Sequence, residues 1–130
     1  MPGEELEAVV TSERFVSIVE DDSSLREALV GLLRSHGYSA RGFANAEDYL
    51  AVRDGLCGCV ISDISMPGLS GLELSDRLRE MGYFVPMIMI TARAEPALEQ
   101  QARDRDIVCL LRKPFAADAL MDCVERALAA

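Results

Sequence analysis

Short apolar runs alternate with helix-length amphipathic stretches along this chain, and this alternation constrains its fold more than any other feature. Five such runs have the length and composition of β-strands. They span residues 15–19, 38–43, 59–62, 87–90 and 108–111. When a helix follows each strand in turn, the strands form a parallel sheet with helices on both faces. The sequence therefore predicts an α/β domain built on one parallel sheet.

The stretches between these runs carry the signals of helices. The first has an apolar stripe of leucines, a capping side chain among residues 22–24, and Gly37 at its end. Pro96 suits the first turn of a later helix. Further helices are predicted at 46–52, from the turn-rich loop 66–71 to about Arg79, and at 117–128.

Size and charge narrow the class of protein. The chain has 130 residues, half of them apolar, which suffices for one domain with a hydrophobic core. No apolar run reaches the length of a membrane span, and a net charge of −9 argues against a nucleic-acid-binding surface. Residues 1–14 are acidic and polar, so we expect a flexible extension there and not a signal peptide. The domain itself is predicted over 15–130.

The four cysteines show no pattern of a metal site. Cys57 and Cys59 lie close together in the sequence. Cys109 and Cys123 do not form a second close pair, and no histidine cluster is present to complete a zinc site. We therefore expect free thiols in a reducing compartment, and a cytoplasmic protein.

Polar or charged residues follow four of the five predicted strands. Glu20-Asp21-Asp22 follows the first, Asp63 the third, Thr91-Ala92 the fourth, and Lys113-Pro114 comes just after the fifth. In a parallel sheet these positions share the carboxyl edge, where such folds bind ligands. Each residue alone is more often a turn residue, a solvated helix start or strand packing. Their joint occurrence at one edge indicates a functional site.

The residue types at this edge point to a metal ion and an anion. Crowded carboxylates raise one another's pKa, and a divalent cation such as Mg²⁺, or alternatively Mn²⁺, removes the repulsion. Lys113 is the single lysine beside twelve arginines. Its compact ammonium suits a tight anion pocket, although chance in an arginine-rich composition explains its singularity about equally well. Together with the Thr91 hydroxyl, these groups suggest a phosphoryl anion beside the metal.

Four segments of the chain resemble the receiver domain of bacterial two-component response regulators. They are Val16–Asp22, Cys59–Gly68, Met89–Ala92 and Leu111–Phe115, and they include the specific combination of Asp-x-x-Met-Pro with Lys-Pro-Phe. The resemblance covers roughly residues 15–130 and is strongest to receivers that precede a helix-turn-helix output domain. It implies a flavodoxin-like, doubly wound sheet of five parallel strands in the order 2-1-3-4-5, with five helices.

The resemblance also implies roles in phosphoryl transfer and switching. Asp63 resembles the phosphoacceptor, Thr91 the switch hydroxyl and Lys113 the partner of the phosphoryl group. Ala92 fits the small position behind the threonine. The switch position three residues before the lysine, often aromatic in the family, is Leu110.

The implied metal site uses oxygen ligands. Asp21 and Asp63 would bind Mg²⁺ directly, Glu20 through a water molecule, and Ser65 through its backbone carbonyl. The pair Glu20-Asp21 replaces the Asp-Asp that is commoner in the family, and the longer glutamate can still hold a metal-bound water. The resemblance further implies a cis peptide bond between Lys113 and Pro114.

The segment before the fifth strand also departs from the family pattern. It usually reads Ala-Gly-Ala, whereas residues 105–107 are Arg-Asp-Ile. We therefore expect the preceding helix to end differently here.

The resemblance implies a regulatory phosphoacceptor and not an enzyme with its own substrate. The expected partners are a sensor histidine kinase, an output domain or downstream protein, for example in transcription, and a second copy on phosphorylation. No direct contact with nucleic acid or membrane is expected.

Two alternatives compete with this interpretation. A phosphatase of the haloacid-dehalogenase type needs Asp-x-Asp, but residues 63–65 end in serine. A receiver-like interaction module without phosphorylation would lack the acids or the lysine that this chain keeps.

Overall fold

The computed structural model describes residues 15–52, 58–93 and 95–129. The extension expected over residues 1–14, like Cys57, lies outside the described residues. Among the described residues, no helix is long and apolar enough to cross a membrane.

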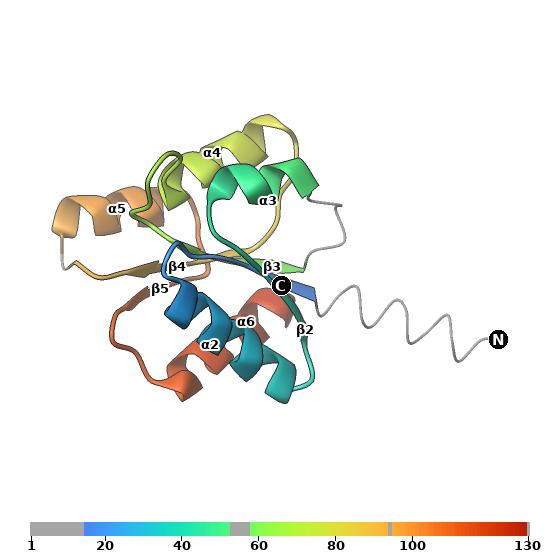
Figure 1. The fold of residues 1–130 in the computed structure, drawn as a ribbon. Coiled ribbons are helices and arrows are strands. Elements are labelled where there is room, and N and C mark those ends of the chain that lie inside the picture. Colours follow the sequence, from blue (N-terminus) through green and yellow to red (C-terminus); the bar gives the residue numbers. More distant parts are fainter. Residues whose placement is uncertain (1–14, 53–57, 94, 130) are drawn as a thin grey trace.

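One sheet of five parallel strands forms the centre of the domain, in the order β2-β1-β3-β4-β5 (Figure 1). This confirms the predicted architecture and strand order. The strands are β1 Phe15–Val19, β2 Ser39–Phe43, β3 Cys59–Asp63, β4 Met87–Thr91 and β5 Cys109–Arg112.

Strands β3 and β4 each extend one residue beyond the predicted apolar run, to Asp63 and Thr91. Their backbones stay in the ladder of hydrogen bonds although their side chains are polar. The Ile64 amide donates to the Ile90 carbonyl at 2.8 Å, and the Lys113 amide donates to the Thr91 carbonyl at 2.8 Å. The positions of Asp63 and Thr91 are thus fixed by the sheet itself, which holds them more rigidly than a loop would.

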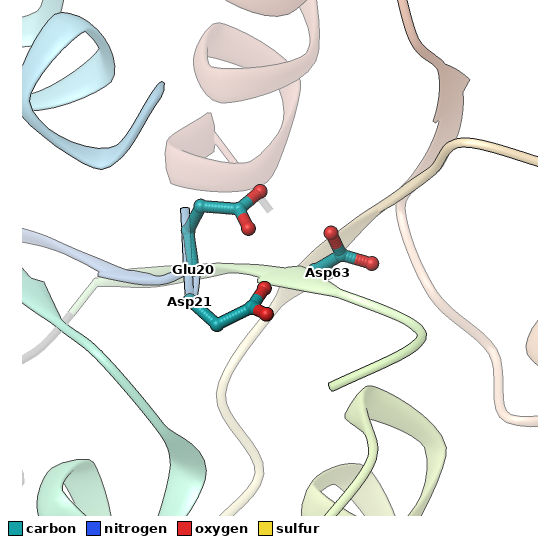
Figure 2. Close-up of side chains that lie close together, drawn as sticks. All are labelled: Glu20, Asp21 and Asp63. Atoms are coloured by element: carbon teal, nitrogen blue, oxygen red, sulfur yellow. The ribbon is translucent and has the colours of Figure 1, made fainter. Parts of the chain in front are cut away.

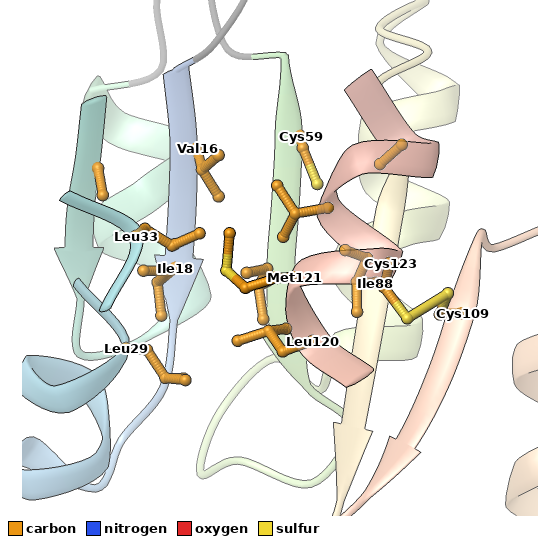
Figure 3. Packing of buried hydrophobic residues seen from close by; sticks show 14 of the residues in the cluster. Val16, Ile18, Leu29, Leu33, Cys59, Ile88, Cys109, Leu120, Met121 and Cys123 are labelled. Carbon is orange, nitrogen blue, oxygen red and sulfur yellow. A yellow bond between two sulfur atoms is a disulfide. The ribbon is translucent and has the colours of Figure 1, made fainter. Parts of the chain in front are cut away.

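The helices cover both faces of the sheet, as Figure 1 shows. They are α2 Ser23–Ser35, α3 Ala46–Val52, α4 Gly71–Glu80, α5 Pro96–Asp104 and α6 Ala117–Ala129. Helices α2 and α6 pack on one face, where Leu29, Leu33 and Leu120 meet Ile18 and Ile88 (Figure 3). Helices α3, α4 and α5 bury a second apolar cluster on the other face.

The α5–β5 connection contains Arg105-Asp106-Ile107, which departs from the pattern that the resemblance implies. Helix α5 ends at Asp104, and Asp106 follows with φ of 60°, a left-handed conformation that aspartate adopts more readily than most residues. Arg105 supports this end, because its guanidinium binds both carboxylate oxygens of Asp76 on α4 at 2.9 Å. The turn before β5 is thus supported by the side-chain contacts of Arg105.

The expectation of free thiols is wrong for one pair of cysteines. Cys109 on β5 and Cys123 on α6 form a disulfide, with their Cα atoms 6.0 Å apart. The two residues are 14 positions apart and belong to different elements. Only the packing of α6 against the sheet brings them together, so their spacing in the sequence did not reveal the pair.

Gly71, the first residue of α4, allows that helix to start directly against the end of β3. Its amide donates to the Ile64 carbonyl at 2.8 Å. A Cβ at this position would overlap the Asp63 carbonyl and lie 3.1 Å from the Ile64 Cα. The start of α4 therefore contacts the backbone at the end of β3, and the contact leaves no room for a side chain at position 71.

We expect Gly71→Ala to lower the free energy of unfolding by about 2–3 kcal/mol, because backbone atoms must move to admit the methyl group. Urea denaturation measures the change. Gly31→Ala is the matched control, since a Cβ at Gly31 meets nothing within 4 Å and should stabilise helix α2 by roughly 0.5–1 kcal/mol. Similar effects of the two substitutions would contradict the close contact at Gly71.

Candidate functional site

Three carboxylates converge at the carboxyl edge of the sheet. Glu20 and Asp21 directly follow β1, and Asp63 ends the neighbouring strand β3. One oxygen from each of them lies within 4.8 Å of the others, and Figure 2 shows Glu20 and Asp21 extending toward the side on which Asp63 lies. Glu20 and Asp63 are buried, whereas Asp21 is exposed. Two acids thus form the floor of the site and one faces solvent.

The backbone around Glu20 is held from several sides. Its amide donates to the Phe43 carbonyl on β2 at 3.0 Å, and the Arg26 guanidinium donates to its carbonyl at 2.8 Å. One carboxylate oxygen, Oε2, accepts from the Asp22 amide at 3.2 Å. Asp22 itself caps helix α2 by accepting from the Ser24 and Leu25 amides. Of the three consecutive acids, Asp22 therefore caps α2, whereas Glu20 and Asp21 belong to the site.

Lys113 joins the two buried acids. Its Nζ lies 2.7 Å from Asp63 Oδ2 and 2.9 Å from Glu20 Oε1, which brings the end of β5 to the ends of β1 and β3. Burial lowers the pKa of Lys113, but its contacts with Asp63 and Glu20 outweigh burial and leave the pKa above its usual value. Lys113 is therefore an ammonium ion in this site. The peptide bond that follows it, to Pro114, is cis, as the resemblance implied.

For the pKa of Glu20, burial outweighs the contacts with its partners. Burial raises the pKa of its carboxyl group, as do Asp21 and Asp63, whereas Lys113 and the Asp22 amide lower it without restoring the usual value. Its Oε1 is buried and, apart from the ion pair with Lys113, accepts no well-aligned hydrogen bond from the described residues. Such an oxygen, next to two further carboxylates, fits the all-oxygen ligand set of Mg²⁺.

The loop after β3 and the end of β4 complete the edge. The Ser65 amide donates to Asp63 Oδ1 at 2.9 Å, so both oxygens of Asp63 have a donor. Thr91 is buried, and its hydroxyl exchanges hydrogen bonds with the backbone N–H and carbonyl of Arg93, each at 3.1 Å. The Arg93 side chain pairs with Glu95 at 3.2 Å and is largely exposed. The threonine hydroxyl is thus engaged with the loop that leads to α5.

The structure brings together Glu20, Asp21, Asp63 and Lys113 from the predicted set. Thr91 and Ser65 belong to the same edge, on the adjoining strand and loop. Of the predicted switch residues, Ala92 is exposed, and Leu110 packs against the cluster on the α3–α5 face.

Two supporting residues were not predicted from the sequence. Arg26 holds the Glu20 backbone. Glu47 on α3 accepts from the Leu69 amide at 3.2 Å and so holds the loop between β3 and α4. Neither belongs to a local motif, so no signal in the sequence pointed to them. By contrast, the start of α4 has a readable signal: Ser70 and Glu73 form a capping box of the form Ser-x-x-Glu.

Comparison with known proteins identifies relatives along almost the whole domain. A family model described as the response regulator receiver domain matches residues 16–125. The transcriptional regulatory protein FixJ of Bradyrhizobium diazoefficiens is 33% identical over 120 residues, which cover 92% of this chain and 58% of FixJ. The transcriptional regulatory protein TdiR of Thauera aromatica is 36% identical over 116 residues, which cover 88% of this chain and 51% of TdiR. This chain spans about half the length of such curated relatives.

Solved structures agree with this comparison. The response regulator StyR is similar with a TM-score of 0.83 and 35% identity, covering 88% of this chain and 59% of StyR. The structure titled FixJ-N is similar with a TM-score of 0.80 and 29% identity, covering 88% of this chain and 93% of FixJ-N.

We expect Mg²⁺ to stabilise the fold, because it relieves the repulsion among the three carboxylates. At about ten times its dissociation constant it should add roughly 1.4 kcal/mol, or about 5 °C in Tm. Thermal unfolding measures this rise in Tm, and Asp21→Asn should lose most of it. Asp22→Asn makes the same change one residue along, at a helix cap that asparagine also serves, and should keep the shift. Equal shifts in both variants, with NaCl at matched ionic strength as the reference, would exclude Asp21 as a ligand.

Proposed function

The chain belongs to the family of response regulator receiver domains, and from this premise we propose that Asp63 is its phosphoacceptor. One observation carries the proposal: Asp63 ends β3 with Lys113 on Oδ2, the Ser65 amide on Oδ1 and two further acids within reach of one metal ion. The remaining assignments follow from this arrangement.

In the proposed reaction the Asp63 carboxylate attacks the phosphorus of a kinase's phosphohistidine or of a small phosphodonor. A P–O bond to Asp63 forms while the bond to the donor breaks, giving an aspartyl phosphate. Lys113 would stabilise the negative charge of the transferred group, and the Ser65 amide would orient the attacking carboxylate. Mg²⁺ held by Asp21, Asp63 and the Ser65 carbonyl, and through water by Glu20, would neutralise charge on the phosphoryl oxygens.

We propose that the response to phosphorylation begins at Thr91. Its hydroxyl now binds the Arg93 backbone, and a phosphoryl oxygen on Asp63 would compete for it. Giving up that contact would release the loop between β4 and α5, a change of the kind that phosphorylation commonly controls. Ala92 leaves room for the movement, and Leu110 would respond by packing and not by rotation of a ring.

The receiver domain would occupy residues 15–130 and act together with other domains or proteins. Longer relatives, of whose length this chain covers about half, are transcriptional regulators by name, so we propose a sensor histidine kinase as phosphodonor and an output domain or downstream protein as target. We propose that this phosphoryl transfer takes place in the cytoplasm. Phosphorylation is also proposed to promote pairing with a second copy.

Asp63→Asn tests the acceptor directly. Wild-type protein incubated with acetyl phosphate and Mg²⁺ should gain the mass of one phosphoryl group, which hydroxylamine removes because it is an acyl phosphate. The variant should gain none, since an amide is a poor nucleophile. Asp22→Asn, which keeps the acceptor, should be labelled like the wild type. Intact-mass analysis decides the matter, and undiminished labelling of Asp63→Asn removes the assignment.

Lys113→Arg tests the geometry of the cation. A single nitrogen contacts two buried carboxylates at 2.7 and 2.9 Å, a position that a planar guanidinium cannot take. We expect phosphorylation to slow roughly tenfold, or about 1.4 kcal/mol of barrier. In this variant, hydrogen exchange in the β4–α5 loop should also no longer change on phosphorylation. Arg77→Lys, the reverse change at an exposed position of α4, should leave both readouts near wild type. Wild-type rates in Lys113→Arg would show that charge alone suffices.

A further inference from the structure

The disulfide lies apart from the proposed phosphoryl chemistry. Cys109 opens β5, an edge strand of the sheet, and Cys123 lies on α6. Figure 3 shows their sulfur atoms bonded between the strand and the helix, at the border of the apolar cluster. Both cysteines are buried, but Cys109 on the edge strand retains 9% exposure against 3% for Cys123.

A guanidinium group accompanies the two sulfur atoms. Nη2 of Arg126, one turn after Cys123 on α6, lies 2.7 Å from Cys109 Sγ and 3.6 Å from Cys123 Sγ. A cation beside a cysteine favours the thiolate, which is the reactive form in thiol–disulfide exchange. A disulfide that serves only as a structural link does not need such a neighbour. The arginine lies closer to the sulfur of Cys109, the less buried of the two residues, so Cys109 is the favoured attacking group.

We propose that Cys109, Cys123 and Arg126 form a reversible dithiol–disulfide site whose oxidant is a small disulfide of the glutathione class. The Cys109 thiolate attacks one sulfur of the oxidant, forming a mixed disulfide and releasing one glutathione thiolate. The Cys123 thiolate then attacks Cys109 Sγ and releases the second. Two protein thiols are oxidised, one disulfide is reduced, and the two protons end on the two glutathione molecules.

The proposed cytoplasmic location favours reversible exchange over a permanent link. Disulfides in reducing compartments are usually transient, in catalysis or redox sensing. Oxidation closes the loop 109–123, which contains Lys113, the cis peptide bond and the start of α6. The oxidised form therefore joins the strand that supplies the site lysine to the last helix. A cross-link across such a loop restricts the unfolded chain and should raise Tm by roughly 10 °C.

The equilibrium experiment uses the full chain in buffers that range from fully reduced to fully oxidised glutathione. Free thiols are alkylated, and peptide mapping identifies the linked pair. A peptide joining Cys109 to Cys123 should form in oxidising buffers and disappear in reducing ones, with the expected rise in Tm. No such peptide at any ratio, or a link between Cys57 and Cys59 instead, would overturn the proposal. No phosphodonor enters this assay, so its outcome is independent of Asp63.

A kinetic experiment tests the role of Arg126. Oxidation of the reduced protein by glutathione disulfide should be about tenfold slower in Arg126→Gln, because less of Cys109 is thiolate. Arg77→Gln, an exposed arginine on α4 at the opposite face of the sheet, should react like the wild type. Equal rates in all three proteins would overturn the assignment of Arg126 to the site. Since Arg126 is exposed, its variant is expected to fold.

Discussion

Repulsion between two buried carboxylates is the constraint on which the rest of the site depends. Glu20 and Asp63 end up side by side because β1 and β3 are neighbours in the sheet, and neither is well solvated. The compensating charge comes from the far end of the chain, since Lys113 follows β5. The order of strands is therefore an electrostatic requirement as well as a matter of packing. Only when β4 and β5 are in place does the ammonium reach both acids.

This dependence explains why the sequence predicted so much of the site. Asp63 and Lys113 are 50 residues apart, but each follows an apolar strand, and the carboxyl ends of parallel strands meet at one edge. Knowing the fold class therefore sufficed to place them together. The direct contact of Lys113 with Glu20 was not predicted, because it depends on the course of one flexible side chain.

The features that sequence reasoning missed share a physical cause. Arg26 on the Glu20 carbonyl, Glu47 on the Leu69 amide and the Cys109–Cys123 bond each join two different segments of the fold, over 6, 22 and 14 residues. Periodicity and capping motifs report on neighbours in sequence, so contacts of this kind leave no local trace. Strand ends were missed by one residue for a related reason. The backbone ladder continues through Asp63 and Thr91 although the apolar pattern stops before them.

The double contact of Lys113 has a consequence for the way the site responds to solvent ions. Lys113 is a cation tethered to the fold, so its effective concentration at the carboxylates is high and does not vary with the medium. A divalent ion that entered the site would have to compete with this charge and would gain only the difference between the two interactions. The acids are held in their arrangement before any ion arrives, and the ion is free to leave again. The lysine thus holds Glu20 and Asp63 in place in advance, and it would keep the occupancy of the site readily reversible.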